Sequence, residues 1–331
     1  METRRFGRSG LDVSALTFGC GAVGGLMTKG DAADQDRAVA WARDNGINHF
    51  DTAPLYGDGA SEENLGRALG QNRDGVIVST KVRLTEHDLS NPATAIRSSL
   101  DTSLSRLKQD SVDLFQLHNT LGANAAEATM SVDQVLNDVV PTFLKLRDEG
   151  KTRFLGFTAN GDTDACLALI NSDQFDGAQI FYNILVPSAG KEMPSGYPAQ
   201  DYGRMIDVAT AKGVGSIGVR VLAGGALSGS EARHPLGMPV VDPIGSGRDY
   251  ATDVQRALRF QPLVDGGAAE TLPELAIRYV ISNASVSTTE IGIATLEELQ
   301  HAAAAVNNGP LSPDALAEID KIQTGFATDR I

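Results

Sequence analysis

The sequence predicts an α/β protein whose parallel strands close into a (β/α)8 TIM barrel. Eight short apolar runs alternate with helical patterns along the 331 residues, and strands that are joined through helices lie parallel with right-handed crossovers. Polar residues stand at the ends of several of these runs, which is where parallel barrels place their chemistry. We therefore expect a closed barrel, rather than an open sheet, in a single domain that spans residues 1–331.

Each predicted strand is a short run rich in β-branched and apolar residues, as strands of buried parallel sheets are. The predicted strands are SALTFGCG (14–21), INHFDTA (47–53), GVIVSTKV (75–82), SVDLFQLH (111–118), TRFLGFTA (152–159), GAQIFYN (177–183), GSIGVRVL (215–222) and TTEIGIA (288–294).

Helical patterns separate these runs. Segments 34–46, 61–70 and 93–108 have apolar residues at the three- and four-residue spacing of an amphipathic helix. The first of them ends at Gly46, which is a typical helix stop. Ahead of the first strand, RRFGRSGLDVS (4–14) carries turn residues between short extended stretches. This segment predicts an N-terminal β-hairpin that caps the bottom of the barrel.

Three long connections follow strands, at 119–131, 184–200 and 223–268. Connections that follow strands lie on the catalytic face of a barrel, and long irregular loops are usually functional or mobile. We therefore expect these three connections to form the walls of a substrate pocket.

Composition narrows the class of protein. Hydrophobic residues make up 42% of the chain and charged residues 21%, which is typical of a globular protein. The net charge is 28 − 42 = −14 without a basic run, so we expect no nucleic-acid partner. The N-terminus lacks an apolar signal region, and no long apolar stretch is present, so we expect no membrane partner. The two cysteines, Cys20 and Cys166, fit a reducing cytoplasm.

Four polar residues follow or end predicted strands and form the candidate catalytic set: Asp51, Tyr56, Lys81 and His118. Each has an ordinary structural interpretation on its own, such as a loop aromatic or a helix cap. Four unrelated structural roles would rarely reproduce one ordered set of motifs, so we interpret the four residues as one site.

The motifs around these residues resemble those of aldo-keto reductases. The resemblance rests on GINHFDTAPLYG with SEENLGRAL, on the strand-ending Lys81 and His118, and on FGCGAVGG, GKTRFLGFTAN, AQIFYN and GGALSG, which together span nearly the whole chain. GFTAN is similar to the sugar (aldose) dehydrogenase branch. The resemblance implies an NAD(P)-dependent oxidoreductase that acts on a small carbonyl, alcohol or sugar.

The same four residues suit this chemistry without reference to any family. Reduction of a carbonyl by hydride leaves negative charge on oxygen, so a proton donor is needed whose pKa lies near working pH. A lysine beside Tyr56 favours the phenolate, and Asp51 would hold Lys81. A neutral His118 would donate to the substrate oxygen.

The resemblance also implies a nicotinamide cofactor, NAD or NADP, held across the barrel mouth without a metal. Its carboxamide would contact Thr158, Asn160 and Gln179, although this chain has Thr-Ala where many relatives have Ser-Asn. The residues expected to contact the cofactor lie at or after strand ends: Gly21, Ala22, Val23, Asp51, Thr158, Asn160, Gln179, Arg220, Leu222, Gly224, Gly225, Leu227, Gly292, Ala294, Thr295 and Glu298.

Two of these positions depart from the family pattern. Where relatives have a stacking aromatic followed by Pro-Leu, this chain has Val219 to Leu222, and Arg220 would reach the pyrophosphate or a substrate anion. Glu298 stands where relatives that prefer NADP carry a basic residue. A carboxylate repels a 2′-phosphate, so Glu298 favours NAD, whereas the family at large favours NADP.

Two other functions remain as alternatives. A barrel lyase or aldolase would use Lys81 to form a Schiff base, but this requires a lysine that is not paired with Asp51. A non-catalytic, cofactor-binding regulatory subunit would keep the fold and lose turnover, but it would not need both Tyr56 and His118.

Overall fold

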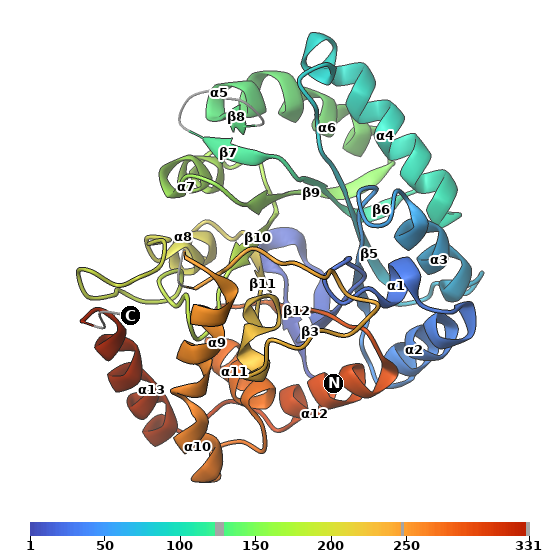
Figure 1. Ribbon diagram of the computed structural model, residues 1–331. Coiled ribbons are helices and arrows are strands. Elements are labelled where there is room, and N and C mark those ends of the chain that lie inside the picture. Colours follow the sequence, from blue (N-terminus) through green and yellow to red (C-terminus); the bar gives the residue numbers. More distant parts are fainter. Residues whose placement is uncertain (123–128, 246–247, 329–331) are drawn as a thin grey trace.

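A closed barrel of eight parallel strands forms the centre of the computed structural model, which describes residues 1–122, 129–245 and 248–328 (Figure 1). Around the barrel the strands are β3 (Leu16–Gly19), β4 (His49–Asp51), β5 (Ile77–Val82), β6 (Val112–Leu117), β9 (Thr152–Ala159), β10 (Gly177–Phe181), β11 (Gly215–Val219) and β12 (Thr288–Gly292), which pairs with β3 again. Every predicted strand contains one of these strands, so the predicted barrel is confirmed.

Helices surround the barrel and cover its outer face (Figure 1). They are α1 (Leu26–Lys29), α2 (Ala32–Asp44), α3 (Ala60–Leu69), α4 (Pro92–Leu107), α5 (Val132–Gln134), the π-helical turn η3 (Val135–Val139), α6 (Val140–Asp148), α7 (Thr163–Asn171), α8 (Met205–Ala211), α11 (Leu272–Ile281), α12 (Leu296–Asn307) and α13 (Pro313–Phe326). None of the helices within the described ranges is long and apolar enough to cross a membrane.

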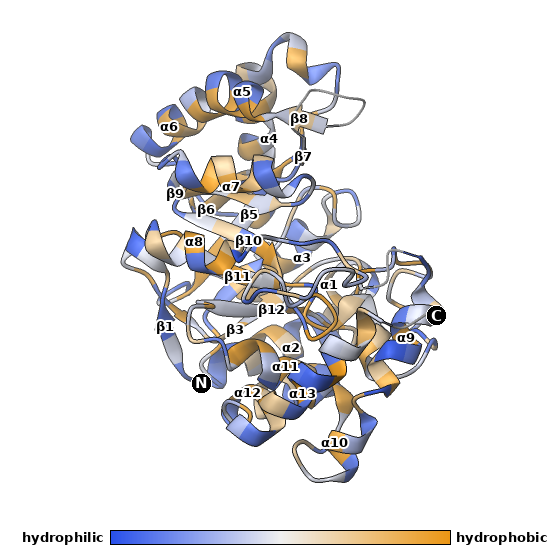
Figure 2. Cartoon of the chain, turned by 90° about the vertical axis from the view of Figure 1, so that its left-hand side faces the viewer, coloured by the Kyte–Doolittle hydropathy of each residue, from blue (hydrophilic) through white to orange (hydrophobic). Residues whose placement is uncertain are grey.

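The predicted N-terminal hairpin is also present. Strands β1 (Thr3–Arg5) and β2 (Asp12–Ser14) pair antiparallel, with Thr3 opposite Ser14, and the short 3-10 turn η1 (Gly7–Ser9) lies between them. In Figure 2 the hairpin lies at the opposite end of the barrel from α9. Phe6 packs so closely on Gly177 and Gly215 that a Cβ atom at either glycine would lie 2.6 Å from the Phe6 ring. The hairpin therefore closes the bottom of the barrel and leaves the other end open for chemistry.

Two of the three long connections are less irregular than the sequence predicts. Segment 119–131 holds the short paired strands β7 (Thr120–Gly122) and β8 (Thr129–Ser131), and its residues 123–128 lie outside the described ranges. Segment 184–200 has no helix or strand. Segment 223–268 contains the 3-10 turn η4 (Ala223–Ser228) and helices α9 (Tyr250–Leu258) and α10 (Gln261–Asp265). The Asp249 carboxylate accepts a hydrogen bond from the Thr252 N–H at 2.7 Å, which is an N-cap that marks the start of α9.

Part of this last connection lies across the barrel mouth (Figure 1), and we call residues 230–245 the strap. The Met238 N–H donates to the Ala22 carbonyl at 3.1 Å, so the strap contacts the loop after β3. The Arg233 guanidinium fixes the strap internally, because it donates to the Met238 carbonyl and to the Gly224 carbonyl, each at 2.6 Å. The strap is therefore anchored to the loop after β3 and to the turn η4 after β11.

Candidate functional site

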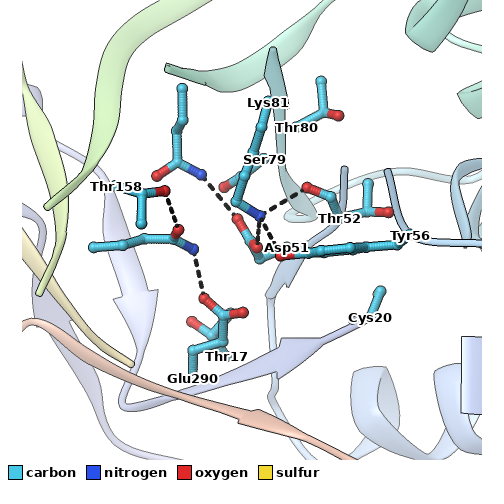
Figure 3. Close-up of polar contacts among 12 residues, drawn as sticks. Thr17, Cys20, Asp51, Thr52, Tyr56, Ser79, Thr80, Lys81, Thr158 and Glu290 are labelled. Carbon is cyan, nitrogen blue, oxygen red and sulfur yellow. Dashed lines mark hydrogen bonds and ion pairs between the residues drawn. The ribbon is translucent and has the colours of Figure 1, made fainter. Parts of the chain in front are cut away.

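Side chains that point into the barrel form three layers, because alternate residues of a strand share a face. The bottom of the barrel is filled by an apolar cluster of Phe6, Leu11, Val13, Ile77, Leu114 and Ile217, and this cluster extends along β11 to Val219 at the end of that strand, with Phe154 and Phe181 packed against it. The middle layer is polar and is formed by Thr17, His49, Ser79 and Thr288. Two residues further along three of these strands, the mouth layer holds Asp51, Lys81 and Glu290 (Figure 3).

The ammonium group of Lys81 is the centre of the mouth layer. Lys81 and Asp51 form an ion pair in which both side chains are fully buried. The Lys81 Nζ atom also donates to the Thr52 carbonyl at 2.9 Å and to the Tyr56 hydroxyl at 3.3 Å (Figure 3). Burial lowers the pKa of Lys81, but Asp51, Tyr56 and Glu290 together raise it more, so the net pKa lies above the ordinary value. Lys81 therefore stays a cation.

The pKa of Tyr56 differs from the sequence-based expectation. Lys81 does lower it, as expected, but burial raises it more, and Asp51 and Glu290 add to the increase, so the pKa of Tyr56 is raised to about 12. The prediction that Lys81 brings this phenol towards working pH was therefore wrong for the protein alone, because desolvation of a phenolate exceeds the attraction of one ammonium group whose charge Asp51 already balances. Tyr56 is a phenol at neutral pH.

His118 lies beside Tyr56, directly after β6. The two rings meet edge to face, with centroids 6.0 Å apart and planes at 89°. Burial, together with the positive charges of Lys81 and Arg83, lowers the pKa of His118 to about 3, so the imidazole is neutral as expected. Its Nδ1 atom is buried and has no hydrogen-bond partner among the described residues. The four candidate residues thus lie together at one end of the barrel.

Three further polar side chains in the mouth layer were not predicted as catalytic. The Gln116 amide donates to the Asp51 carboxylate at 2.9 Å, and it lies two residues before His118 on the same inward face of β6. The Gln179 amide donates to the Glu290 carboxyl at 2.8 Å. The alternation of inward residues could have identified Gln116, whereas the position of Glu290 depends on how the barrel closes between β12 and β3.

The residues expected to contact the carboxamide do not all lie together. The Thr158 hydroxyl donates to the Gln179 side-chain oxygen at 2.8 Å, so these two residues are neighbours at the mouth. The Asn160 amide instead donates to the Thr120 hydroxyl at 3.2 Å, in the small sheet outside the barrel. This position agrees with the sequence, in which Ala159 stands where many relatives have the asparagine and Asn160 comes one residue later.

The other predicted cofactor positions follow the ends of β3, β11 and β12. Gly21, Ala22 and Val23 form the loop under the strap, and Leu222 directly precedes the turn η4, which contains Gly224, Gly225 and Leu227. Gly224 and Gly225 have φ values of 67° and 108°, which favour glycine. Arg220 also has a left-handed φ, of 58°, and its Nη1 atom is buried without a hydrogen-bond partner among the described residues. A buried N–H group without a partner is costly, so the Nη1 atom of Arg220 suits an anionic ligand.

Thr295 is the N-cap of α12. The Thr295 hydroxyl accepts from the Glu298 N–H at 3.2 Å, and the Glu298 carboxylate accepts from the Ala294 N–H at 2.7 Å. Glu298 lies in the first turn of α12 and is exposed to solvent, so its negative charge faces the solvent beside the N-terminus of this helix. The described ranges contain no cluster of three or more side chains that would hold a metal ion, and Cys20 and Cys166 are both buried as free thiols.

Comparisons with known proteins agree with this geometry. The model of the aldo/keto reductase family matches residues 15–324. The chain is 29% identical to L-galactose dehydrogenase from Arabidopsis thaliana over 97% of this chain and 94% of that protein. It is 26% identical to a probable voltage-gated potassium channel subunit beta from the same plant, over 97% and 96%. The structure of aldo-keto reductase AKR11C1 from Bacillus halodurans, in its holo form, superposes with a TM-score of 0.73 at 24% identity, covering 97% of this chain and 96% of that one.

Proposed function

The chain belongs to the aldo/keto reductase family, and from that premise we propose that it transfers hydride between a nicotinamide cofactor and a small carbonyl or alcohol substrate. The single observation that carries this proposal is the contact of a fully buried Lys81–Asp51 ion pair with the Tyr56 hydroxyl. This arrangement offers an acid for the carbonyl oxygen and a cation that stabilises the phenolate left behind.

In this proposal Tyr56 donates its hydroxyl proton to the substrate oxygen during reduction and takes it back during oxidation. The ammonium group of Lys81, 3.3 Å from the hydroxyl, stabilises the phenolate. Asp51 is a positioning residue, because its carboxylate holds Lys81 and accepts from Gln116. The neutral His118 donates a hydrogen bond to the same substrate oxygen and orients it.

The residues at the mouth fit a nicotinamide cofactor, which supplies or accepts the hydride when bound. Arg220 and His118 each have a buried polar atom without a partner among the described residues, and the N-terminus of α12, where Thr295 and Glu298 already hold the N–H groups of Glu298 and Ala294, would face a phosphate with the N–H groups that remain. Thr158 and Gln179 would hold the carboxamide, and the loop at 21–23 and the turn η4 would hold the pyrophosphate. The remaining contacts, made by Gly292, Ala294, Thr295 and Glu298 at or after the end of β12, are proposed from the sequence.

Calorimetry with NADH and NADPH, followed by turnover of a panel of aldehydes, ketones and aldoses, tests this function. We expect binding of at least one of the two nucleotides and turnover of at least one substrate class. Binding of neither nucleotide would contradict the proposal.

The second candidate is a regulatory subunit that binds the cofactor without turnover, and the similarity to a probable potassium channel subunit beta favours it. Tight nucleotide binding without turnover of any carbonyl in the panel would support this candidate. The Schiff-base alternative loses support, because Lys81 is held as a cation by Asp51 whereas a Schiff base needs the free amine.

Cofactor choice is predicted to depend on Glu298. Glu298→Arg should raise the affinity for NADPH by about tenfold or more, since it replaces repulsion by a charge-assisted hydrogen bond of about 1.5–3 kcal/mol, weakened by solvent. Glu298→Gln is the matched control, because glutamine can still accept from the Ala294 N–H and only the charge is lost. Calorimetric dissociation constants measure the effect. A wild type that strongly prefers NADPH and does not respond to Glu298→Arg would place residue 298 away from the 2′-phosphate.

The strap is predicted to affect cofactor retention. Arg233→Ala removes the donors to the Gly224 and Met238 carbonyls, so the strap should open more often and the cofactor dissociation constant should rise by about tenfold. Arg97→Ala is the control, since it removes an ion pair with Glu149 on the outer ring of helices. Equal cofactor dissociation constants for Arg233→Ala and the wild type would show that the strap does not retain the cofactor and can contact only the substrate.

A further inference from the structure

Glu290 is an acidic residue inside the barrel. It lies on β12 opposite Thr17 of β3, two residues after Thr288. The Thr288 hydroxyl is within the barrel, 2.7 Å from that of Thr17, and alternate residues of a strand share a face. The Glu290 side chain therefore points inward, one layer above, at the level of Asp51 (Figure 3).

The Glu290 and Asp51 carboxyl groups share one neighbouring ammonium group, that of Lys81. One Glu290 oxygen accepts from the Gln179 amide at 2.8 Å, and Asp51 is the neighbour that shares a hydrogen bond with the acid form. The charged or titratable groups that face it are Asp51, Lys81, Tyr56, Cys20 and Arg220. Lys81 already forms its ion pair with Asp51, so a second carboxylate here would be poorly balanced.

A carboxyl group in this position is expected to keep its proton. Burial raises the pKa of Glu290 to about 8, and the Asp51 carboxylate adds to the increase while Lys81 opposes it. At neutral pH the acid form donates to Asp51 and accepts from Gln179, so both of its polar contacts are satisfied.

We propose that Glu290 is a positioning residue of the reaction, a neutral carboxylic acid that joins Gln179 to the Asp51 carboxylate and thereby holds Lys81 against Tyr56. This role rests on the proposed hydride-transfer function. It couples the side chain that would hold the carboxamide to the side chains that move the proton. Loss of the Glu290 proton places a second negative charge near Tyr56, and this charge is one of the causes that raise the pKa of the phenol, so the phenol donates its proton less readily once Glu290 is ionised.

The test compares the wild type with Glu290→Gln, Glu290→Leu and Thr289→Val. Glutamine reproduces the neutral acid, since its oxygen can accept from Gln179 and its amide can donate to Asp51. Leucine removes both contacts. Thr289→Val is the matched control on the same strand, because its hydroxyl is buried without a partner among the described residues.

The first measurement is kcat for carbonyl reduction against pH. We expect kcat of the wild type and of Thr289→Val to fall by up to about tenfold as pH rises through about 8. Glu290→Gln should lack this fall, and Glu290→Leu should have a lower kcat and a higher cofactor KM at every pH. Rescue by glutamine and not by leucine is the signature of a positioning role.

The second measurement needs no activity and follows chemical unfolding from pH 5 to pH 8. The pKa of Glu290 is raised in the folded protein from an ordinary value of 4.5 to about 8. The folded state thus binds the proton more tightly, and stability from this group is present below about 4.5 and is lost as pH rises towards 8. The unfolding constant of the wild type relative to Glu290→Gln should therefore rise with pH, by up to about tenfold per unit.

The outcomes separate the two proposals. Turnover with superimposable pH profiles in the wild type and Glu290→Gln would overturn the positioning role and leave the hydride-transfer function intact. If the unfolding constants of the wild type and of Glu290→Gln change with pH in parallel, Glu290 is not a neutral acid in the folded protein. Absence of turnover in every protein would overturn the hydride-transfer function and, with it, the positioning role.

Discussion

Tyr56→Phe is expected to reduce kcat for carbonyl reduction by about 10²- to 10⁴-fold, which is the usual contribution of a general acid. The substitution removes only the hydroxyl, which accepts a hydrogen bond from Lys81 at 3.3 Å. The ring that faces His118 stays in place. Because the pKa of Tyr56 is raised to about 12, the phenol is fully protonated at neutral pH and is available as a donor. The loss should therefore appear in kcat, while the dissociation constants of NADH and NADPH stay within a few-fold of the wild type.

Tyr197→Phe is the matched control for this experiment. It removes the same hydroxyl from a tyrosine that donates to the Leu185 carbonyl and has no contact with Lys81. Steady-state kinetics with one aldehyde, together with calorimetric cofactor binding, separates loss of the proton donor from loss of the fold. A Tyr56→Phe protein that keeps near wild-type kcat would show that another group supplies the proton.

The barrel and the four candidate residues could be predicted because both follow from local sequence. A buried parallel strand is a continuous apolar run, and a polar residue at the C-terminal end of such a run lies at the mouth of the barrel. Asp51, Lys81 and His118 were identified in this way, and the structure places all three around Tyr56. The family resemblance gave their order, and the family model confirms that resemblance over residues 15–324.

What could not be predicted depends on contacts between distant strands. Glu290 faces Asp51 only because β12 pairs with β3 and closes the barrel, across 239 positions of sequence (290 − 51). Tyr56 has a raised pKa because burial outweighs Lys81, and burial is a property of the packed mouth. The strap reaches Ala22 through a backbone hydrogen bond that has no side-chain signal. Helix α9 was missed because its cap at Asp249 lies in a segment rich in glycine and proline.

Asp51→Asn is expected to lower the free energy of unfolding by about 3–5 kcal/mol, the range found when one partner of a buried ion pair is removed. Lys81 would keep its hydrogen bonds to the Thr52 carbonyl and the Tyr56 hydroxyl but lose its counter-charge at a position without solvent contact. Neutral Lys81 would then be favoured, and the stabilisation of the Tyr56 phenolate would be lost as well. We therefore expect kcat to fall together with stability.

The double variant Asp51→Asn, Lys81→Met tests whether the unpaired charge is the cause. Methionine fills a similar volume without a charge, so the double variant should recover part of the stability that Asp51→Asn loses, yet remain inactive because no cation faces Tyr56. Glu318→Gln is the control, since it removes the carboxylate from the exposed Glu318–Lys321 pair, where an effect below about 1 kcal/mol is expected. Urea unfolding at pH 7 measures all three. If Asp51→Asn destabilises no more than Glu318→Gln, Lys81 is already neutral or hydrated in the folded protein, and the electrostatic basis of the proposed proton transfer fails with it.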